Sequence, residues 1–391
     1  MRTRRFLLLF PAFALVLAGV TACKGGVSFD CPDAPAVAST TVVSTTCSLT
    51  YTPAPGATTT TVPPTTTSTT VPPTTTTTTM PTTTTTSSTP PPSEFPTPAT
   101  TGAPANTAFQ PVRNGDMTIT QPGTYSGLHV TGALIVKAAG VTITNSWIEG
   151  NGVNANEVLD NETTTAGAAR MTVTNTTIGN PAVCNGQPGL GEHDYTADHV
   201  RIIGMGDGFR VSGNNVTIQN SFVQTCDHTT NHDDGTQIFC PPTAVPQPCQ
   251  NVVIDHNTLS NAGTRNFTAP VFGGGDPGGS NGQFANSRIT NNLLWGGVFT
   301  IDTAGKNLTI TGNRVATNRW TMPDGSACES NSSGVTTPQG CSYAGWVWGA
   351  SAVSQSGSTC AQQGVTWTDN RAVPMDSNWQ PTNTGTALAC A

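Results

Sequence analysis

The stretch VTITNSWI (141–148) returns along the second part of the chain in six variants. These are MTVTNTTI (171–178), VTIQNSFV (216–223), VVIDHNTL (252–259), SRITNNLL (287–294), LTITGNRV (308–315) and VTWTDNRA (365–372). Each variant alternates apolar and polar residues, and then has a polar pair rich in Asn and another apolar residue. The alternation predicts a short strand with one buried face. Asn suits a turn at its end, because Asn caps local backbone groups and tolerates left-handed conformations.

The central apolar residues of these phrases recur at intervals of roughly 20 to 60 positions, which fits a solenoid coil with loop insertions. They are Ile143, Val173, Ile218, Ile254, Ile289, Ile310 and Trp367. Ile202, in HVRIIG (199–204), divides one interval unevenly and has no clear place. A second row of short strands precedes the phrase, at GLHV (127–130), GFRV (208–211), GTQI (235–238) and VFTI (298–301). A coil of this kind cannot bury its apolar face alone, so neighbouring coils must supply the core.

The repeat, with Asn at the strand end, resembles the right-handed parallel β-helix of the pectate-lyase-like superfamily. The resemblance covers residues 108–391 and rests on the repeat, not on a catalytic signature. We therefore expect an all-β domain, a right-handed parallel β-helix, over 108–391. An antiparallel β-sandwich is the alternative, since it too has short, evenly spaced strands.

The N-terminal part indicates export. Arg2, Arg4 and Arg5 precede the apolar run 6–20, which is typical of a secretory signal. The run ends in Val20-Thr21-Ala22-Cys23, which resembles a bacterial lipoprotein signal, so we expect a signal peptide over 1–22 and lipidation of Cys23. A plain secretory signal cut near Ala22 is the alternative. The protein would then lie at the outer face of the bacterial cell membrane and touch it only through the lipid.

Two segments separate the anchor from the domain. Residues 23–50 contain Cys31 and Cys47 and are expected to form a small Cys-loop. Residues 51–107 are dominated by Thr and Pro, and such a composition cannot bury a core, so we expect a disordered stalk.

Composition excludes several classes of protein. Only 9% of the 391 residues are charged, which argues against a long helical bundle or coiled coil. Fifteen Lys and Arg stand against 22 Asp and Glu, a net charge of −7, so there is no basic surface for a nucleic acid. We expect no nucleic-acid partner, and a monomer.

The cysteines predict disulfides rather than a metal site. There are eleven, an odd number that becomes even if Cys23 is lipidated. Spacing alone does not fix the pairing. No CxxC pair is present, which argues against zinc. Short separations in sequence favour the pairs Cys31–Cys47, Cys240–Cys249, Cys328–Cys341 and Cys360–Cys390, which leaves Cys184 to pair with Cys226.

The repeat is broken most densely at CDHTTNHDDGTQIFC (226–240), and the chemistry is expected there. GDGFRV (206–211) aligns with DDGTQI (233–238), so Asp207 is predicted to stack near Asp234 on the next coil. Arg210 and Gln237 are predicted to point outward from adjacent coils. Asp207 with Asp234, or Asp233 with Asp227, is the better working pair, because Asp233 and Asp234 are neighbours in sequence.

β-Helix enzymes of the resembled superfamily act on long acidic glycans, and the resemblance implies roles for this cluster. The catalytic candidates are His232, Asp234, Asp233, Asp207 and Arg210. The candidates for substrate binding are Gln237, His228, His256 and Arg265. Ca²⁺ is the one cofactor to consider, and its candidate ligands are Asp227, Asp233 and Asp207. A purely structural role stays open for all of them. Asp before Gly is common in turns, and an outward Arg can simply cover the surface of a sheet.

The predicted function is binding of an extracellular acidic polysaccharide, with cleavage by β-elimination if the protein is an enzyme. Elimination needs neutralisation of a uronate carboxylate and a base for the neighbouring proton. One alternative is a non-catalytic, adhesin-like β-helix that binds a glycan or a protein. A glycoside hydrolase is the second alternative, but the chain lacks the Gly-His-Gly and basic tripeptide of polygalacturonase-type hydrolases. It also lacks the DGxxD calcium phrase of pectate lyases.

Overall fold

The computed structural model describes two parts of the chain. They are residues 26–30 and 48–52, and residues 94–390 without 153–154, 164–168, 229–231, 241–248, 265–267, 274–283, 298–299, 304–305 and 319–363. One unit ends at Thr84 and the other begins at Thr85. In the first unit, β1 (Gly26–Asp30) pairs antiparallel with β2 (Ser48–Thr52), and Asp30 lies opposite Ser48.

The predicted signal peptide, the lipidation of Cys23 and the Cys31–Cys47 disulfide fall outside the described residues and stay predictions. In the parts of the chain that are described, no helix is long and apolar enough to cross a membrane.

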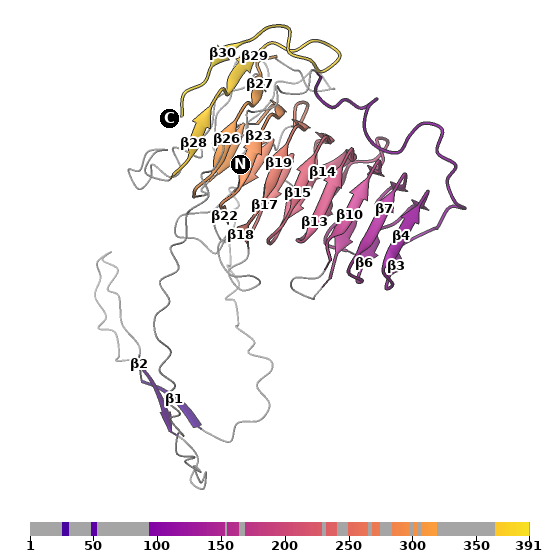
Figure 1. Cartoon of the computed structure of the whole chain (residues 1–391). Coiled ribbons are helices and arrows are strands. Elements are labelled where there is room, and N and C mark those ends of the chain that lie inside the picture. The colour runs from indigo at the N-terminus through magenta and orange to yellow at the C-terminus, as the bar shows by residue number, and fades with distance from the viewer. Residues whose placement is uncertain are drawn as a thin grey trace, which may run out of the picture. The chain divides into compact units, whose positions relative to one another are not determined.

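The second unit is built from stacked parallel strands (Figure 1). We name the nine-stranded sheet of Figure 1, which runs from β4 to β28 in chain order, the first sheet. Its strands are β4 (Gly123–Ser126), β7 (Val141–Thr144), β10 (Met171–Thr174), β13 (Tyr195–Asp198), β15 (Thr217–Gln219), β19 (Val253–Asp255), β23 (Arg288–Thr290), β26 (Thr309–Thr311) and β28 (Thr366–Thr368).

Two further rows of strands complete the coils, and they join through the long strand β14 (Arg201–Val211), which pairs in both. The row that we name the second sheet holds the first half of β14. Its other parallel strands are β5 (His129–Val130), β8 (Trp147–Ile148), β11 (Thr177–Ile178), β16 (Phe222–Thr225), β20 (Thr258–Ser260), β24 (Leu293–Trp295), β27 (Arg314–Ala316) and β29 (Arg371–Val373), and β30 (Thr386–Ala387) pairs antiparallel with β29.

The remaining row, the third sheet, holds the second half of β14. Its other strands are β3 (Met117–Ile119), β6 (Leu134–Val136), β9 (Leu159–Asn161), β12 (Asn185–Gly191), β17 (Thr236–Ile238), β21 (Val271–Gly273) and β25 (Ile301–Thr303). A separate pair is formed by β18 (Cys249–Gln250) and β22 (Phe284–Ala285).

These pairings confirm the predicted fold class. The described residues form strands and no helix, and the strands of all three sheets pair in parallel with those of the neighbouring coil. An antiparallel sandwich is thereby excluded. The chain is an all-β solenoid of stacked coils, compatible with a parallel β-helix.

The register of the first sheet corrects one part of the sequence interpretation. Ala197 of β13 pairs with Val173 on one side and with Ile218 on the other. Ile202 lies in the second sheet, between Ile178 and Val223. The strand that had no clear place is therefore the second strand of a regular coil, and the first-sheet strand before it was missed because it carries a small Ala.

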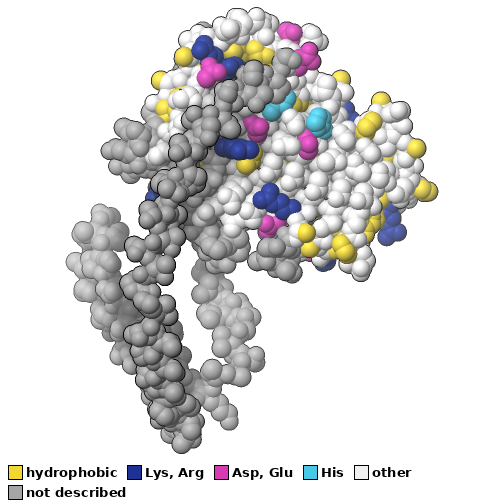
Figure 2. Space-filling model, in the orientation of Figure 1, with side chains coloured by type: hydrophobic (Ala, Val, Ile, Leu, Met, Phe, Trp, Pro, Cys, Tyr) yellow, Lys and Arg dark blue, Asp and Glu magenta, His cyan; other side chains and the backbone are white. Residues whose placement is uncertain are grey.

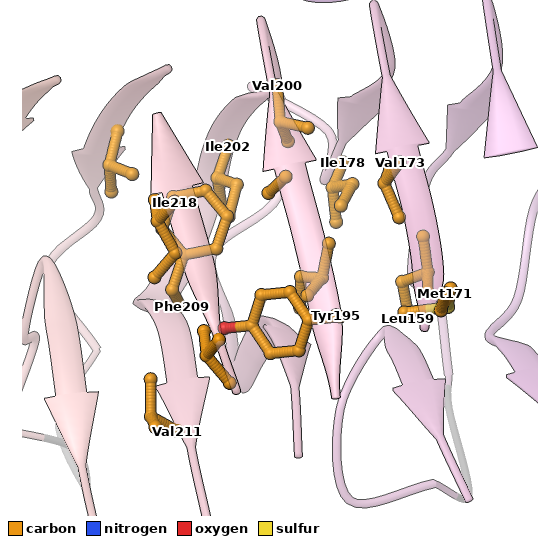
Figure 3. Close-up of a cluster of buried hydrophobic side chains, with 14 of the residues drawn as sticks. Leu159, Met171, Val173, Ile178, Tyr195, Val200, Ile202, Phe209, Val211 and Ile218 are labelled. Carbon is orange, nitrogen blue, oxygen red and sulfur yellow. The ribbon is translucent and has the colours of Figure 1, made fainter. Parts of the chain in front are cut away.

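The interior is filled by the inward side chains of all three sheets. Figure 3 shows Tyr195 and Phe209, the two rings of this cluster, among aliphatic side chains of neighbouring coils, and both are fully buried. The Tyr195 hydroxyl donates to the backbone oxygen of Arg210 at 2.9 Å. A buried phenol therefore has its partner, as a polar group inside a core requires.

A two-residue turn joins the first sheet to the second in each coil. Its first residue takes a positive φ: Asn145, Asn175, Asn220 and Asn291 lie between 46° and 55°. This confirms the role that the sequence predicted for Asn, which enters the left-handed region more easily than most residues.

The second residue of the turn points inward, and in the later coils it is Asn. Asn257, Asn292, Asn313 and Asn370 are all buried. The Asn292 side-chain oxygen accepts from the backbone and side-chain N–H groups of Asn257 at 2.9 and 3.0 Å. Asn292 donates in turn to Ile254 O and to the Asn313 side chain. We name this column the asparagine ladder; it satisfies buried polar groups and fixes coil on coil.

Residues 94–107, which the sequence assigned to the stalk, lie against the solenoid. Phe95 N–H donates to the Gln380 side chain at 2.8 Å, and Gly102 N–H donates to His199 O at 2.9 Å. Arg201 donates to Pro98 O at 2.9 Å. The packed unit therefore begins before Ala108, and the remainder of the predicted stalk falls almost wholly outside the described residues.

The asparagine ladder yields a stability prediction. Asn292→Ala removes the acceptor of the buried Asn257 N–H and the side-chain donor to Ile254 O, so we expect a loss of about 2–4 kcal/mol in the free energy of unfolding. Thr309→Ala, on the exposed face of β26, should change it by less than about 0.5 kcal/mol. Urea unfolding of both variants measures the difference, and an equal effect would contradict the role of the ladder.

Candidate functional site

The outward face of the third sheet places one residue of each coil in a column. Arg210 pairs with Gln237, Gln237 with Phe272, and Phe272 with Asp302. On the other side of Arg210, Gly191 pairs with Asp160. The residues before them in the strands, among them Phe209 and Thr236, are fully buried. The predicted outward direction of Arg210 and Gln237 agrees with this register.

Arg210 is held by groups from two other coils. Its Nε and one terminal nitrogen donate to the Gln237 side-chain oxygen at 3.1 and 2.7 Å. Its other terminal nitrogen lies 3.5 Å from a Glu157 oxygen. The Arg210 side chain is 30% exposed, whereas that of Glu157 is fully buried. Arg210 therefore presents a fixed positive charge at the surface of the third sheet.

Asp207 and Asp234 stack as the alignment of their coils predicts. The backbone N–H of Asp234 donates to the Asp207 carboxylate at 2.8 Å, and the Asp234 carboxylate accepts from Ala269 N–H at 3.0 Å. Each carboxylate thus caps the next coil along the stack. Both are buried, Asp234 completely. These two carboxylates join successive coils before the third sheet, as the asparagine ladder joins them at the turn between the first and second sheets.

Burial makes this carboxyl pair easy to protonate. It raises the pKa of Asp234 well above its usual range, and the charge of Asp207 raises it further. Burial also raises the pKa of Asp207, but the Asp234 N–H, Arg210, His232 and His228 oppose that shift. The two environments therefore favour a proton on Asp234 over a proton on Asp207.

The two histidines of the cluster contact different coils, and the His232 ring lies edge-on to Phe272 with 6.5 Å between ring centres. His232 is exposed, and His228 is partly buried. The His228 ring lies over Gly186, where a Cβ would come within 2.5 Å of it. His228 also lines a groove of about 550 Å³ beside Asn151 and Gln187. The two imidazoles therefore contact coils on either side of the Arg210–Gln237 pair.

Two disulfides hold the loops around this cluster. Cys184 bonds to Cys226 and Cys240 bonds to Cys249, as the spacing of the cysteines suggested. Cys226 directly precedes Asp227 and His228. Cys390 is also disulfide-bonded. Cys328, Cys341 and Cys360 lie outside the described residues, as do Cys31 and Cys47.

Asp233 and Asp227 have no strand geometry. Asp233 is buried with a φ of 51°, and β17 begins only at Thr236, so the alternation of a strand does not set the directions of Asp233 and Asp234. Asp227 is partly buried in the connection after β16. In the described part of the chain, no group of three acidic, Cys or His ligands includes Asp227, Asp233 or Asp207.

His256 does not join the cluster. It is the first residue of the turn between the first and second sheets, with a φ of 53°. One ring nitrogen contacts the Asn220 side chain at 2.7 Å, and the other contacts Glu94 O at 3.0 Å. Burial lowers its pKa. His256 thus ties the segment 94–107 to a different corner of the coil. Arg265 lies outside the described residues.

Sequence reasoning missed a second acidic group on the same face. Oxygens of Glu157, Asp160 and Glu192 all lie within 4.8 Å of one another. Burial, followed by the charge of Glu192, raises the pKa of Glu157 to about 9 and that of Asp160 to about 6. The signal was present: aligning Leu159-Asp160-Asn161 with Phe209-Arg210-Val211 places Asp160 in the outward column. This segment lacks the Gly that precedes the matching residues in GFRV (208–211) and GTQI (235–238), so the sequence alone does not suggest the alignment.

Asp302 is the other residue that the sequence did not reveal. It follows Phe272 in the outward column and is 5% exposed. Burial raises its pKa to about 7. Charged side chains are sparse on the face seen in Figure 2, as the composition requires, so buried acids grouped along one column are a distinctive feature.

The chain was compared with models of protein families, with curated proteins and with solved structures, and no match was found in any of the three. The interpretation of the site therefore depends on its geometry and chemistry.

The capping role of Asp207 can be separated from a chemical one. Asp207→Asn keeps an oxygen that accepts from the Asp234 N–H, so the free energy of unfolding should stay within about 1 kcal/mol of the wild type. Asp207→Ala leaves that N–H without its acceptor and should cost about 1–3 kcal/mol. Urea denaturation distinguishes the two variants. Equal losses would show that the contact does not cap the coil.

Proposed function

We propose that this protein binds an acidic extracellular polysaccharide on the outward face of its third sheet and cleaves it by β-elimination. The observation that carries the proposal is the fixed, partly exposed guanidinium of Arg210, held by Gln237 of the next coil, with His232 against Phe272 one coil further on. A row of coils suits a long, regular chain, because each coil offers an equivalent position along it.

Arg210 matches the charge of a uronate. A guanidinium binds a carboxylate through two parallel N–H groups, and its planar fork is oriented before the substrate arrives. Two N–H groups of Arg210 are committed to Gln237, which sets the plane of the fork. Neutralising the uronate in this way acidifies the neighbouring carbon-bound proton, the first requirement of elimination.

His232 is the best base for that proton. It is exposed, and its ring lies edge-on to Phe272, which follows Gln237 in the outward column. The ordinary pKa of a histidine lies near neutrality, which suits a general base. Asp207, with its caps, would orient the imidazole. Asp234 is too deeply buried to reach a glycan, so we assign it a positioning role only.

A non-catalytic glycan-binding module is the second candidate function. It is favoured by the capping contacts of Asp207 and Asp234, which give both acids a structural purpose without any reaction. Hydrolysis is less well supported, because it needs two accessible carboxyl groups held apart by the substrate. Three further parts of the proposal rest on the sequence. They are the superfamily resemblance, the lipid anchor at the outer face of the cell membrane, and the monomeric state.

The proposal is tested by incubating the mature full chain with polyuronates and with neutral glycans, with and without Ca²⁺, and weighing the products by mass spectrometry. We expect products from a polyuronate that are one water lighter than hydrolysis gives. His232→Ala should slow the reaction by about 10²-fold or more, the usual contribution of a general base. Arg210→Lys should weaken binding because the fork is lost.

Arg288→Lys, on an exposed position of the first sheet, is the matched control and should behave as the wild type. Water-added products would favour the hydrolase. Binding without cleavage would favour the non-catalytic module. Neither binding nor cleavage of any polyuronate would contradict the proposal.

A further inference from the structure

We propose that Glu157, Asp160 and Glu192 bind one divalent cation of the calcium class in a structural site on the outer side of the third sheet. Glu157 and Asp160 come from the coil of β9, and Glu192 directly follows β12 on the next coil. One oxygen of each carboxylate lies within 4.8 Å of the other two. A cation between them would therefore join two adjacent coils. This proposal is independent of any action on a glycan.

Unsatisfied oxygens point to a ligand at this place. Asp160 is fully buried, yet no hydrogen bond of ordinary geometry reaches either of its carboxylate oxygens. Glu157 is also fully buried, and its Oε2 has no hydrogen-bond partner. Buried polar atoms in native proteins are nearly always satisfied by protein, water or an ion. Unsatisfied oxygens on two fully buried carboxylates that lie beside a third carboxylate therefore indicate a missing partner with positive charge.

The local backbone makes room for such a cluster. Gly191 occupies the outward column between Asp160 and Arg210, and a Cβ there would lie 2.4 Å from Glu157 Cγ. The absence of a side chain at Gly191 lets the Glu157 carboxylate lie over the sheet. Glu192 has a φ of 91°, a conformation that residues other than glycine rarely adopt. Both features bring carboxylates together against their mutual repulsion.

The chain's own cations do not balance this charge. Arg210 approaches one Glu157 oxygen at 3.5 Å and is shared with Gln237. Lys137 is paired with Glu162 at 3.0 Å.

The donor set selects the kind of metal. All three ligands are carboxylates, with no His or Cys, and hard oxygen donors suit Ca²⁺ or Mg²⁺ rather than zinc. Calcium takes 6–8 oxygens in flexible geometry, so water can complete its shell on the side of Glu192, which is only partly buried. Because Glu157 and Asp160 are closed off from solvent, this cation cannot bridge to a polysaccharide and serves stability instead.

The test uses the mature full chain, stripped of metal with a chelator. Ca²⁺ at about 1–10 mM, the range bound by extracellular calcium modules, should raise the Tm by about 2–4 °C. Tb³⁺ should bind with a stoichiometry of one, and Ca²⁺ should displace it. Asp160→Asn, which keeps the shape of the side chain, should weaken Tb³⁺ binding at least tenfold and abolish the Ca²⁺-dependent rise in Tm.

Glu162→Gln is the matched control. Glu162 lies two residues from Asp160 and pairs with Lys137 at the surface, so its substitution should leave Tb³⁺ affinity within about threefold of the wild type. Tb³⁺ binding that Asp160→Asn leaves unchanged would place the cation elsewhere and overturn the proposal. No Ca²⁺-dependent rise in Tm and no Tb³⁺ binding would overturn it as well. Neither result depends on whether the protein cleaves a glycan.

Discussion

The buried turn between the first and second sheets is the constraint on which the rest of the structure depends. A residue in the left-handed region turns the chain, and the next residue points inward with a polar side chain that must find partners away from water. In the later coils that residue is Asn, and each Asn both donates to and accepts from its neighbours along the stack. In earlier coils Ser221 and Ser146 do related work, each accepting an N–H from the preceding coil.

This constraint fixes register, and register creates the surface. Once one corner of every coil is locked in place, the strands that follow align residue on residue. A slip of one residue would turn each outward side chain into the core. The outward column of the third sheet is the chemical consequence, since it brings Asp160, Arg210, Gln237 and Asp302 into one line from segments far apart in sequence. Buried carboxylates such as Asp207 and Asp234 accept backbone N–H groups of the next coil and so help to align the same strands.

The fold was predictable because one repeated stretch, VTITNSWI (141–148) and its variants, indicates both the strand and the turn that follows it. The prediction failed for β13, where Ala197 replaces a bulky apolar residue and His199 replaces Asn at the turn. The alignment of Asp207 with Asp234 succeeded because both precede a Gly that leads into paired strand residues, Phe209 and Thr236. Glu157 and Asp160 were missed because their strand has no such marker. His256 was grouped with the cluster by nearness in sequence, whereas a coil carries such neighbours to different corners.

Segment 94–107 shows that composition alone does not predict which residues pack against the solenoid. Pro, Thr and Ala gave no apolar pattern there, and the residues were assigned to the stalk. In the structure their backbone groups bond to His199, Arg201 and Gln380, and Phe95 stacks with His256 at 6.0 Å between ring centres. Such contacts depend on groups from distant coils, so no local pattern could reveal them.

A crystal structure of the mature protein grown with Ca²⁺, with anomalous diffraction used to locate the ion, tests the central claim most directly. We predict Arg210 beside Gln237 in the outward column of the third sheet. We also predict one anomalous peak about 2.3–2.6 Å from oxygens of Glu157, Asp160 and Glu192. A different register at Arg210, or calcium bound only at other residues, would contradict this claim.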